Sequence, residues 1–566
     1  MKICVKQKVK NSNKLSDKEI LSLLLTNREI KEEDIFFHPP HPLTFSLASF
    51  GFKKQIAHML KLLENIRLNK EAIVVYTDYD ADGITGGTIM WETLYLLGFS
   101  VMPYVPHRKK EGYGFSTIGI DAVNKLHHPK LIISVDHGIS GAKQISYAKK
   151  LGISVIVTDH HLKPKEEPKD AETIFHIPAL SGSGVAYFVA KEIFKHFSTT
   201  NDQRLTTYFQ SDYLALATIG TIADLVPLTD TSRSIVYHGL KTFQTLKRPG
   251  LIHILQEAKI ENRQITPYEI GYVIAPRINA VGRLEHAIDA LRLLCTNDPH
   301  KASALAQHMG QTNKDRQDLV KTSLSEALEM VEKIIKKQKK IPVFIILINK
   351  NWHEGIIGLI AGKITEKYYR PTLVLTKSNG FWKGSARSIN ALHITDFLRT
   401  FEKNIISVGG HKQAAGLSVS DKKLETLVQD IEKSISKYIK NKDLEKTISV
   451  DLEIPLEKAS LKLAKELELL EPFGMGNPQP LFLSDAQIIT ITPLGKKGDH
   501  LKLIVKNPIQ SSFPLECVNF SPPQESFSLK RGDIVQIVFS LEVNRWNGRE
   551  KVQGRIIYIF PHCEGG

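Results

Sequence analysis

Apolar residues in the first half of the chain occur as short runs that alternate with stretches of helical composition. The apolar runs at residues 72–76, 131–135 and 155–157 have the length of buried strands. The stretches at residues 88–97 and 142–151 contain the residue types of helices. Strands that alternate with helices in this way are typical of a parallel sheet with crossover helices. The pattern therefore predicts an α/β domain in this part of the chain.

The pattern changes after residue 300. Residues 301–340 are polar, with apolar residues at irregular helical spacing, which predicts a long helix. Its lysine-rich end is interpreted as a solvated charge run, with a DNA contact as the alternative. An apolar run at residues 343–348 begins a second α/β unit. Short strands with polar turns then favour a small β-barrel, with runs at residues 486–492, 501–505, 534–540 and 551–559.

The charge balance adds a candidate partner to this picture. The formal net charge is +15, which suggests a polyanionic partner because Lys and Arg bind phosphates largely by releasing counterions. The alternative is a protein that is merely basic. The N-terminal residues 1–45 are a small extension with one helix, at residues 17–26.

Cysteine usage and hydropathy exclude several classes of protein. The four cysteines form no CxxC pair, which argues against a disulfide scaffold or a zinc ribbon and fits a reducing compartment. No apolar run approaches the roughly 20 residues of a membrane span. The N-terminus lacks the apolar core of a signal peptide. We therefore expect a cytoplasmic protein with no membrane partner.

Acidic residues and histidines follow each of the three expected strands. The first strand runs into Asp78-Tyr79-Asp80-Ala81-Asp82, whose carboxylates alternate and would project to one side of an extended segment. The second strand runs into Asp136-His137, and the third runs into Asp159-His160-His161. In open parallel sheets ligands bind beyond the carboxyl ends of the strands, so these three clusters can converge. Their mutual repulsion is costly unless a cation neutralises it.

The donor set indicates which cation. Carboxylate and imidazole without thiolate suit Mn²⁺ or Mg²⁺ better than a structural zinc. Two such ions can clamp a phosphodiester and activate a water. Asp224 is a further candidate ligand, because an acid within the long apolar run 218–228 is expensive to bury unless it is paired or bound to a metal. The alternatives are that the acids cap helices or form salt bridges and that His160 and His161 are ordinary loop histidines.

These residues resemble the DHH phosphoesterase superfamily, which is named for the triplet found here as Asp159-His160-His161, and within it the bacterial RecJ family. Residues 78–83 match the first motif of that family. The loop that comes next in the family has a similar counterpart in this chain, formed by Pro106-His107-Arg108 and residues 111–114. The remaining motifs of the family are matched by residues 275–283, 384–388, 409–416 and 471–478. The similarity spans about residues 45 to 560 in the family's domain order.

The resemblance implies the fold class and the domain order. We expect a parallel-sheet DHH domain and a second, DHHA1-type α/β domain joined by a long helix, with the active site in the cleft between them. A C-terminal OB-fold β-barrel would complete a groove that admits one DNA strand and excludes a duplex. The expected domains are an N-terminal extension (1–45), a DHH catalytic domain (46–300), a connecting helix (301–340), a DHHA1-type substrate-binding domain (341–445), and a linker with an OB-fold DNA-binding domain (446–566).

The resemblance also implies an activity: a 5′→3′ exonuclease on single-stranded DNA that uses two Mn²⁺ or Mg²⁺ ions and releases 5′-mononucleotides in DNA recombination and repair. His161 would contact the scissile phosphate, and Asp159 would orient the histidines, because ligating imidazoles need a partner for their other nitrogen. Asp78 would be a ligand or an acid just behind the ligands. The ligands carried over by position are Asp80, Asp82, Asp136, His160 and Asp224.

The second domain supplies the expected contacts with the substrate. Arg387, with Ser385 and Ser388, can bind phosphate oxygens, and His411 lies in a glycine-flanked loop that a phosphate can approach closely. Arginines that would bind the 5′ end or neighbouring phosphates, with structural salt bridges as the alternative, are Arg108, Arg277 and Arg283. Trp546 of the OB-fold would either stack on a base or lie in the core. A single-stranded-DNA-binding protein and a helicase are the implied partners of a monomer.

Two segments depart from the family's pattern. His137 stands where the family often has a cysteine or a small polar residue, and it would either add a metal contact or pack. Residues 175–186 lack the usual Asn-Pro and are shorter, but they keep a Gly-x-Gly-Val-Ala ending. Two other functions stay open: a phosphodiesterase for short oligonucleotides or cyclic dinucleotides, and a non-catalytic DNA-binding replication scaffold. The length of the expected groove argues against the first, and the intact acid and histidine set argues against the second.

Overall fold

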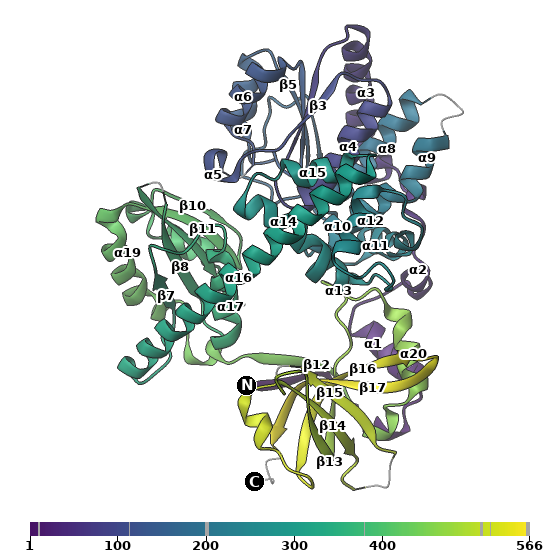
Figure 1. Cartoon of the computed structure of the whole chain (residues 1–566), viewed down its shortest axis with the longest axis vertical. Helices are drawn as coiled ribbons and strands as arrows, with labels where there is room; N and C mark the ends of the chain where they lie inside the picture. The colour runs from purple at the N-terminus through teal and green to yellow at the C-terminus, as the bar shows by residue number, and fades with distance from the viewer. Residues whose placement is uncertain are drawn as a thin grey trace. The chain divides into compact units, whose positions relative to one another are not determined.

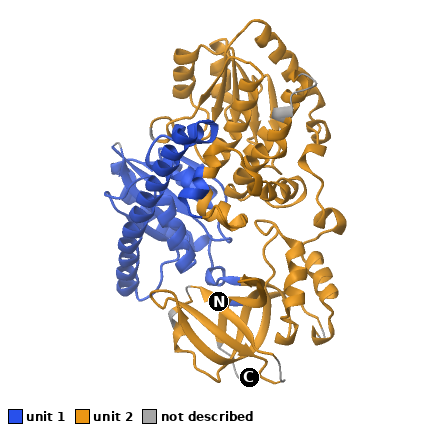
Figure 2. Cartoon of the chain, turned by 45° about the vertical axis from the view of Figure 1, so that its right-hand side comes forward, with its two compact units in different colours: residues 1–2, 253–259, 276–447 blue, residues 3–252, 260–275, 448–566 orange. Residues whose placement is uncertain are grey.

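The computed structural model describes residues 1–9, 12–112, 114–198, 203–378, 380–509, 513–520 and 522–561. Tyr113 of the predicted loop motif and Cys563 lie outside the described residues. The chain divides into two compact units (Figure 2). Unit 2 contains residues 3–252, 260–275 and 448–566, and unit 1 contains residues 1–2, 253–259 and 276–447.

A five-stranded parallel sheet forms the centre of the first α/β domain, as predicted (Figure 1). Its strand order is β3-β2-β4-β5-β6. The central strands β2, β4 and β5 are buried because helices cover both faces, which explains their nearly continuous apolar sequences. The strands are β2 (Ile73–Thr77), β3 (Val101–Tyr104), β4 (Leu131–Val135), β5 (Ser154–Asp159) and β6 (Thr173–His176).

The two faces of this sheet are covered by different helices. On one face Ile132 packs in a cluster with Ile120 of α6 (Thr117–His127) and Ile145 of α7 (Ala142–Lys150). On the other face Gly86 of α4 packs against Val135, since an added Cβ would lie 2.9 Å from its Cγ1. The helices that extend this second layer are α3 (Lys53–Leu68), α4 (Ala81–Leu96), α8 (Gly182–Phe197), α9 (Gln203–Gln210) and α10 (Asp212–Ala223).

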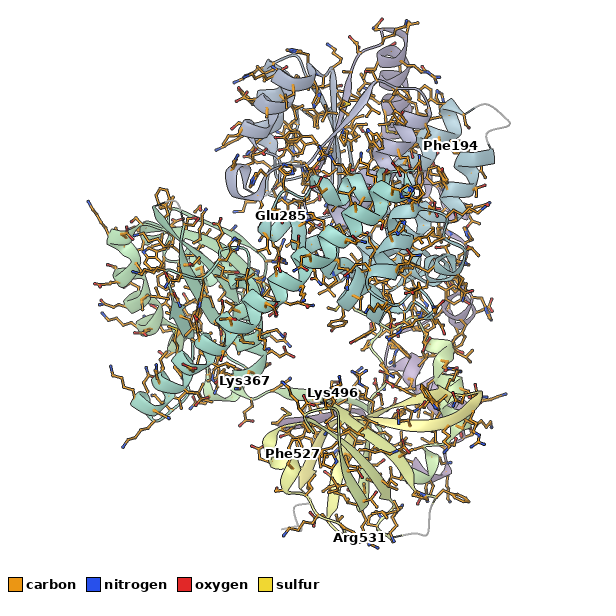
Figure 3. The ribbon with its side chains drawn as sticks, viewed as in Figure 1. Phe194, Glu285, Lys367, Lys496, Phe527 and Arg531 are labelled. Carbon is orange, nitrogen blue, oxygen red and sulfur yellow. The ribbon has the colours of Figure 1, made fainter. Side chains whose placement is uncertain are left out.

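Further helices continue unit 2 after α10. Aromatic rings join the end of α8 to α9, where Phe194, labelled in Figure 3, stacks on Phe209 at 5.6 Å between ring centroids. The remaining elements of this region are α11 (Asp230–Thr242), α12 (Pro249–Glu257), α13 (Pro267–Glu269) and a π-helical turn, η5 (Ile270–Ile274). The last part of α12, with the two residues that follow it (residues 253–259), belongs to unit 1.

The C-terminal part of unit 2 contains a closed five-stranded barrel with an OB-type order, β13-β14-β15-β17-β16, which the pairing of β13 with β16 closes. This confirms the predicted fold. Four of the strands extend beyond the apolar runs that predicted them, whereas β15 was not predicted. Their bounds are β13 (Phe482–Leu494), β14 (His500–Lys506), β15 (Leu515–Phe520), β16 (Ile534–Trp546) and β17 (Arg549–Pro561). Trp546 ends β16 and is 75% exposed, so of its two interpretations the one that places it in the core is wrong.

The N-terminal residues pack with this C-terminal domain. Strand β1 (Lys2–Gln7) lies beside β12 (Thr447–Glu453), which pairs with the barrel strand β13. Helix α1 (Asp17–Thr26), at the residues predicted for it, buries Leu24 in the core of the barrel and packs against α20 (Leu461–Leu467). The extension therefore completes the hydrophobic core of a domain more than 400 residues away in sequence.

A buried arginine joins three parts of unit 2. Arg233 of α11 donates hydrogen bonds to the carbonyl oxygens of Phe36, Glu471 and Pro472, and its guanidinium lies 3.8 Å from the ring centroid of Phe36. Phe36 belongs to α2 (Glu33–Phe37). Burial lowers the pKa of Arg233 to about 10. The side chain thus fixes the N-terminal extension and the lead-in to the barrel on the first α/β domain.

Unit 1 contains the second α/β domain and the long helix. Helix α16 (Pro299–Gln338) begins and ends within two residues of the predicted 301–340. The sheet order is β10-β11-β9-β8-β7, with only β7 and β8 parallel. Its strands are β7 (Ile345–Ile348), β8 (Thr372–Ser378), β9 (Phe381–Arg387), β10 (Ser407–Gly410) and β11 (Ala414–Val419). The helices of this unit are α14 (Ala275–Leu284), α15 (Ile288–Cys295), α17 (Ile357–Tyr368), α18 (Ile394–Arg399) and α19 (Asp421–Ser434).

Candidate metal centre

The predicted acidic clusters lie at the carboxyl edge of the parallel sheet. Asp78 follows β2, Asp136 follows β4, and Asp159 is the last residue of β5. Asp136 adopts a left-handed backbone conformation (φ 68°), which turns the chain directly after the strand. A helix delivers Asp224, which is the C-terminal cap of α10. Four elements therefore supply acids to one region of unit 2.

The segment Asp78–Asp82 is not extended, contrary to the interpretation of its alternating carboxylates. Asp80 is the N-cap of α4, and its Oδ1 accepts hydrogen bonds from the backbone N–H groups of Asp82 and Gly83, at 3.1 Å each. The helix thus begins at Ala81, seven residues before the predicted start, because the capping carboxylate satisfies its first N–H groups. Asp82 consequently lies in the first turn of a helix, and its position relative to Asp80 is helical.

Three groups of side chains have donor atoms close enough to hold a cation. They are Asp78 with Asp80 and Asp136, Asp82 with His160 and Asp224, and Asp136 with His160 and His161; within each group the donor atoms lie within 4.8 Å of one another. Asp136 and His160 are each shared between two groups. This sharing is the arrangement expected of two neighbouring cation sites.

Four donor atoms of these groups form no hydrogen bond. Both carboxylate oxygens of Asp78, Oδ1 of Asp136 and Nε2 of His160 are buried and accept or donate no hydrogen bond. Nε2 of His160 lies 3.1 Å from Oδ1 of Asp136 and 3.4 Å from Oδ2 of Asp224. Buried carboxylates without partners are costly, and divalent cations with oxygen and nitrogen ligands remove that cost. The donor set therefore fits Mn²⁺ or Mg²⁺.

Electrostatics at the site point the same way. Burial, and then the charges of neighbouring carboxylates, hold the pKa of Asp136 well above its ordinary value. The same causes raise the pKa of Asp78 well above that value and the pKa of Asp224 to about 8, although the Asp224 side chain is 34% exposed. A bound cation opposes these shifts because it stabilises the ionised carboxylates.

Asp159 and His161 form an ion pair beside the ligand groups. Oδ1 of Asp159 lies 2.8 Å from Nδ1 of His161 and also accepts the backbone N–H of His160 at 2.7 Å, while Oδ2 accepts that of Ile139 at 2.8 Å. Burial acts against both charges, but the hydrogen bond and the opposite charge prevail, so the pKa of His161 is raised to about 9 and that of Asp159 is lowered. The geometry gives Asp159 the means to orient the His161 ring.

The N-terminus of α8 holds Asp82, a contact that sequence reasoning missed. The backbone N–H groups of Gly182 and Ser183 donate to the two oxygens of Asp82, at 2.6 and 2.9 Å. A helix N-terminus favours a carboxylate through its free N–H groups and its dipole. The only sequence signal was the Gly-x-Gly-Val-Ala ending, which matches the family but does not reveal the partner.

Two glycines leave room for the ligands. A Cβ at Gly182 would lie 2.4 Å from both Cβ and Oδ1 of Asp136. A Cβ at Gly220 of α10 would lie 2.2 Å from Oδ1 of Asp82. Backbone atoms surround the site so closely that only glycine fits at these positions. The site is thus assembled by close packing of α4, α8 and α10 behind the acids.

We expect Gly182→Ala to lower the exonuclease activity that the sequence resemblance implies by about 100-fold, because the added methyl displaces Asp136 by about an ångström. Single-turnover rates measure the effect. Gly184→Ala is the matched control on the same helix turn, since its Cβ would meet Ile235, Leu180 and Ser181 at an ordinary 3.4 Å. Equal rates for the two variants would contradict the requirement for glycine at position 182.

His137 packs and does not join a ligand group among the described residues. Its ring is 97% buried, between Tyr76 at 5.1 Å and Phe115 at 5.7 Å between ring centroids. Burial lowers the pKa of His137 to about 4. Of the two interpretations of this residue, the structure supports packing.

Arg108 is the predicted substrate residue that belongs to unit 2. It begins α5 (Arg108–Glu111), and its guanidinium lies 5.1 Å from the ring centroid of Tyr79. Glu111 fixes this loop by accepting hydrogen bonds from the backbone N–H of His107 at 2.7 Å and from the hydroxyl of Tyr104 at 2.9 Å. The sequence motif identified this loop, but the bracing role of Glu111 was missed.

The other predicted substrate residues belong to unit 1. Arg387 of β9 donates to Oγ of Ser385 at 3.2 Å, and Gly358 at the start of α17 leaves room beside both. Arg283 donates to the carbonyl oxygen of Gly355 at 3.4 Å. Nε of Arg277 lies 2.6 Å from Oε2 of Glu257. The hydroxyl of Ser388 donates to the carbonyl oxygen of Leu392 at 2.8 Å. His411 follows β10 and is exposed. Arg277 thus forms a structural salt bridge, which was the alternative to phosphate binding for these arginines.

Family models match three parts of the chain. Residues 72–221 match the DHH family N-terminal domain, residues 340–437 match the DHHA1 domain, and residues 450–558 match the RecJ OB domain. These matches cover the parallel sheet with its acids, the second α/β domain and the barrel. The three models follow one another in the order that the motifs predicted.

Curated relatives and solved structures agree with these models. The chain is 30% identical over 528 residues to the single-stranded-DNA-specific exonuclease RecJ of Haemophilus influenzae, covering 89% of this chain and 90% of that protein. It is 33% identical over 496 residues to RecJ of Bacillus subtilis, covering 86% of this chain, and it spans 60% of that longer protein. The crystal structure of RecJ in complex with Mn²⁺ from Thermus thermophilus superimposes with a TM-score of 0.78 at 26% identity, covering 95% of this chain and 75% of that one.

Membership thus rests on the barrel and the second α/β domain as well as on the acids and histidines of the parallel sheet. An identity of 30% that covers 90% of the Haemophilus influenzae protein includes all three matched domains. The chain belongs to the RecJ family of single-stranded-DNA-specific exonucleases.

Proposed function

We propose that the chain is a metal-dependent exonuclease that digests single-stranded DNA from its 5′ end and releases 5′-mononucleotides. The observation that carries this proposal is the set of buried donor atoms on Asp78, Asp136 and His160 that form no hydrogen bond, in a chain of this family. Relatives with the same domain order are named single-stranded-DNA-specific exonucleases. The Thermus thermophilus structures contain Mn²⁺ or Mg²⁺.

The ligands proposed for two such ions are Asp78, Asp80, Asp82, Asp136, His160 and Asp224. When bound, the ions supply Lewis-acid chemistry at a phosphodiester and lower the pKa of a water. His161, protonated through its pair with Asp159, donates to a phosphate oxygen and stabilises the charge that develops there. Asp159 keeps that ring in one orientation, and the N-terminus of α8 keeps Asp82 in place.

The substrate contacts proposed for the rest of the strand are phosphate contacts. Arg108 lies on the same unit as the acids, and its charge acts on Asp78. Arg283, Ser385, Arg387, Ser388 and His411 would bind further phosphates, and Arg277 would act through its pair with Glu257. The protein would work in DNA recombination and repair, as a monomer in the cytoplasm, with a single-stranded-DNA-binding protein and a helicase as partners. Among the described residues no helix is both long and apolar enough to span a bilayer.

Digestion of end-labelled single-stranded DNA tests the proposal. We expect Mn²⁺ or Mg²⁺ to support release of mononucleotides from a 5′-labelled strand, with no digestion in EDTA and little of a blunt duplex. Dinucleotides and cyclic dinucleotides serve as comparison substrates in the same assay. Release of label only from the 3′ end would contradict the polarity, and preferential hydrolysis of the dinucleotides would contradict the substrate.

A further inference from the structure

Two exposed tyrosines stand stacked on one turn of unit 2. Tyr268 and Tyr272 are 57% and 72% exposed, and their rings lie 5.0 Å apart between centroids with 29° between their planes. Single exposed apolar side chains are common, but a stacked pair of large rings in water leaves both outer faces uncovered. No salt bridge, catalytic role or core contact described above involves these rings.

Hydrogen bonds brace the start of the turn that carries the tyrosines. Thr266 and Glu269 form a capping box at its start, with Oε2 of Glu269 accepting from the backbone N–H of Thr266 at 3.1 Å and from its hydroxyl at 2.6 Å. The residues that follow form the π-helical turn η5, a form that is frequent at functional sites. A rigid aromatic pair loses little conformational entropy when a ligand covers it.

The turn lies against the end of the helix that delivers Asp224. A Cβ built at Gly271 would be 3.7 Å from Cγ2 of Ile222, which is two residues before Asp224 in α10. Both elements belong to unit 2, so their contact is part of one compact body. The turn that carries the aromatic pair therefore contacts the helix that ends at Asp224.

Leu225 adds a second exposed apolar side chain at the same end of α10. It follows Asp224 directly, is 65% exposed, and has a left-handed backbone conformation (φ 58°). That conformation costs a branched residue about 1 kcal/mol or more compared with glycine, and its side chain is not buried in return. Strain of this kind next to a site is typical of a functional contact.

We propose that Tyr268 and Tyr272 form a stacking platform for unpaired nucleobases of the strand whose phosphodiester is bound at the metal centre, with Leu225 contacting the base beside the scissile phosphate. This inference rests on the proposed function. Every base has an aromatic face, so the platform binds without reading sequence. Bases in a duplex have both faces covered by their neighbours, so the platform favours single strands over duplexes.

Kinetics on oligonucleotides test the platform. We expect the double variant Tyr268→Leu/Tyr272→Leu to raise KM for a single-stranded oligodeoxynucleotide by about tenfold or more, since base stacking on an aromatic ring typically contributes a factor of about 5 to 150. Its kcat stays within a few-fold of that of the unaltered protein, because the reacting atoms are untouched. The double Phe variant keeps KM, since it keeps the rings.

An abasic substrate separates stacking from a general structural effect. Removing the bases that reach the platform raises KM for the unaltered protein, whereas the Leu double variant shows little further loss. Quenching of 2-aminopurine fluorescence in the oligonucleotide should also disappear in that variant. Equal KM values for the variant and the unaltered protein, or the same added loss on abasic DNA in both, would overturn the platform.

The chain offers a matched control in a second exposed aromatic pair. Tyr95 is 58% exposed and stacks on Trp91 at 5.1 Å, near the far end of α4 from Asp82, about 20 Å along the helix axis. Tyr95→Leu leaves KM unchanged if only the platform binds bases, and an equal rise in KM would overturn the assignment. If the unaltered protein digests no single-stranded DNA, the proposed function fails, whereas normal digestion by the Leu double variant overturns only the platform.

Discussion

Asp136→Asn is expected to lower the rate of metal-dependent DNA digestion by on the order of 1,000-fold. Asp136 is shared between two of the three ligand groups, so an amide there weakens both cation sites. Loss of about 4 kcal/mol of charge stabilisation in the transition state corresponds to that factor. Single-turnover digestion of labelled single-stranded DNA with saturating Mn²⁺ measures it.

The same substitution is expected to stabilise the protein in EDTA. Burial, and then the charges of Asp82, Asp80 and Asp78, keep the pKa of Asp136 well above the ordinary value. Asparagine removes that repulsion at nearly constant shape, so the midpoint of thermal unfolding should rise in EDTA, while the gain that Mn²⁺ gives the unaltered protein should shrink. Functional sites commonly lower the stability of the fold that carries them, in exchange for activity.

A buried acid with cationic neighbours provides the control. Asp451 is also buried, but it lies 2.9 Å from Nζ of Lys6 and 3.7 Å from a guanidinium nitrogen of Arg28. Asp451→Asn should lower the unfolding midpoint, with or without Mn²⁺, because it leaves those cations without their partner. If Asp136→Asn also destabilised the protein in EDTA, the repulsion inferred at the metal centre would be wrong.

The ligand edge was predictable because of a general property of parallel sheets. Their strands end at one edge, so the acids after three apolar runs had to meet there. Asp78, Asp136 and Asp159 were found in this way, and the cost of burying an acid within the apolar run 218–228 pointed to Asp224. The alternation of Asp78, Asp80 and Asp82 was misleading, because a period of two also arises where a strand passes into a capped helix.

What escaped prediction depends on contacts between distant segments. Asp82 and Gly182 are 100 residues apart, and no local pattern marks a carboxylate that will meet the N-terminus of another helix. The same holds for Arg233, whose partners lie 197 and 238 residues away. For this reason the sequence did not show that the N-terminal extension packs with the C-terminal domain, although its helix α1 was predicted at the correct residues. Helix starts and apolar runs are local features, whereas such pairings are set only when the domains pack.

Asp159→Asn is expected to reduce kcat by about 10- to 100-fold, as is typical when the partner that orients a functional imidazole is lost. The carboxylate holds Nδ1 of His161 at 2.8 Å and raises its pKa to about 9, so the ring is protonated at neutral pH. An amide cannot sustain that charge, and burial then favours the neutral ring. Steady-state kinetics with Mn²⁺ measure the loss of kcat, and Asp170→Asn, at an exposed salt bridge with Lys149, is the control. Wild-type kcat in Asp159→Asn would contradict the role of the pair.

The pH dependence of stability supplies the independent readout. Because the folded pKa of His161 is raised above its unfolded value near 6.5, its contribution to the free energy of unfolding is fully present below pH 6.5 and is lost as the pH rises through 9. Asp159, whose pKa is lowered, contributes to stability above its unfolded pKa of 3.8. The full contribution of the pair is therefore present from pH 3.8 to pH 6.5, and it is lost as the pH rises through 9. In EDTA the unfolding midpoint of the unaltered protein should therefore exceed that of Asp159→Asn at pH 7, and the difference should shrink by pH 10. A difference that stayed constant across this range would show that His161 carries no charge in the folded protein.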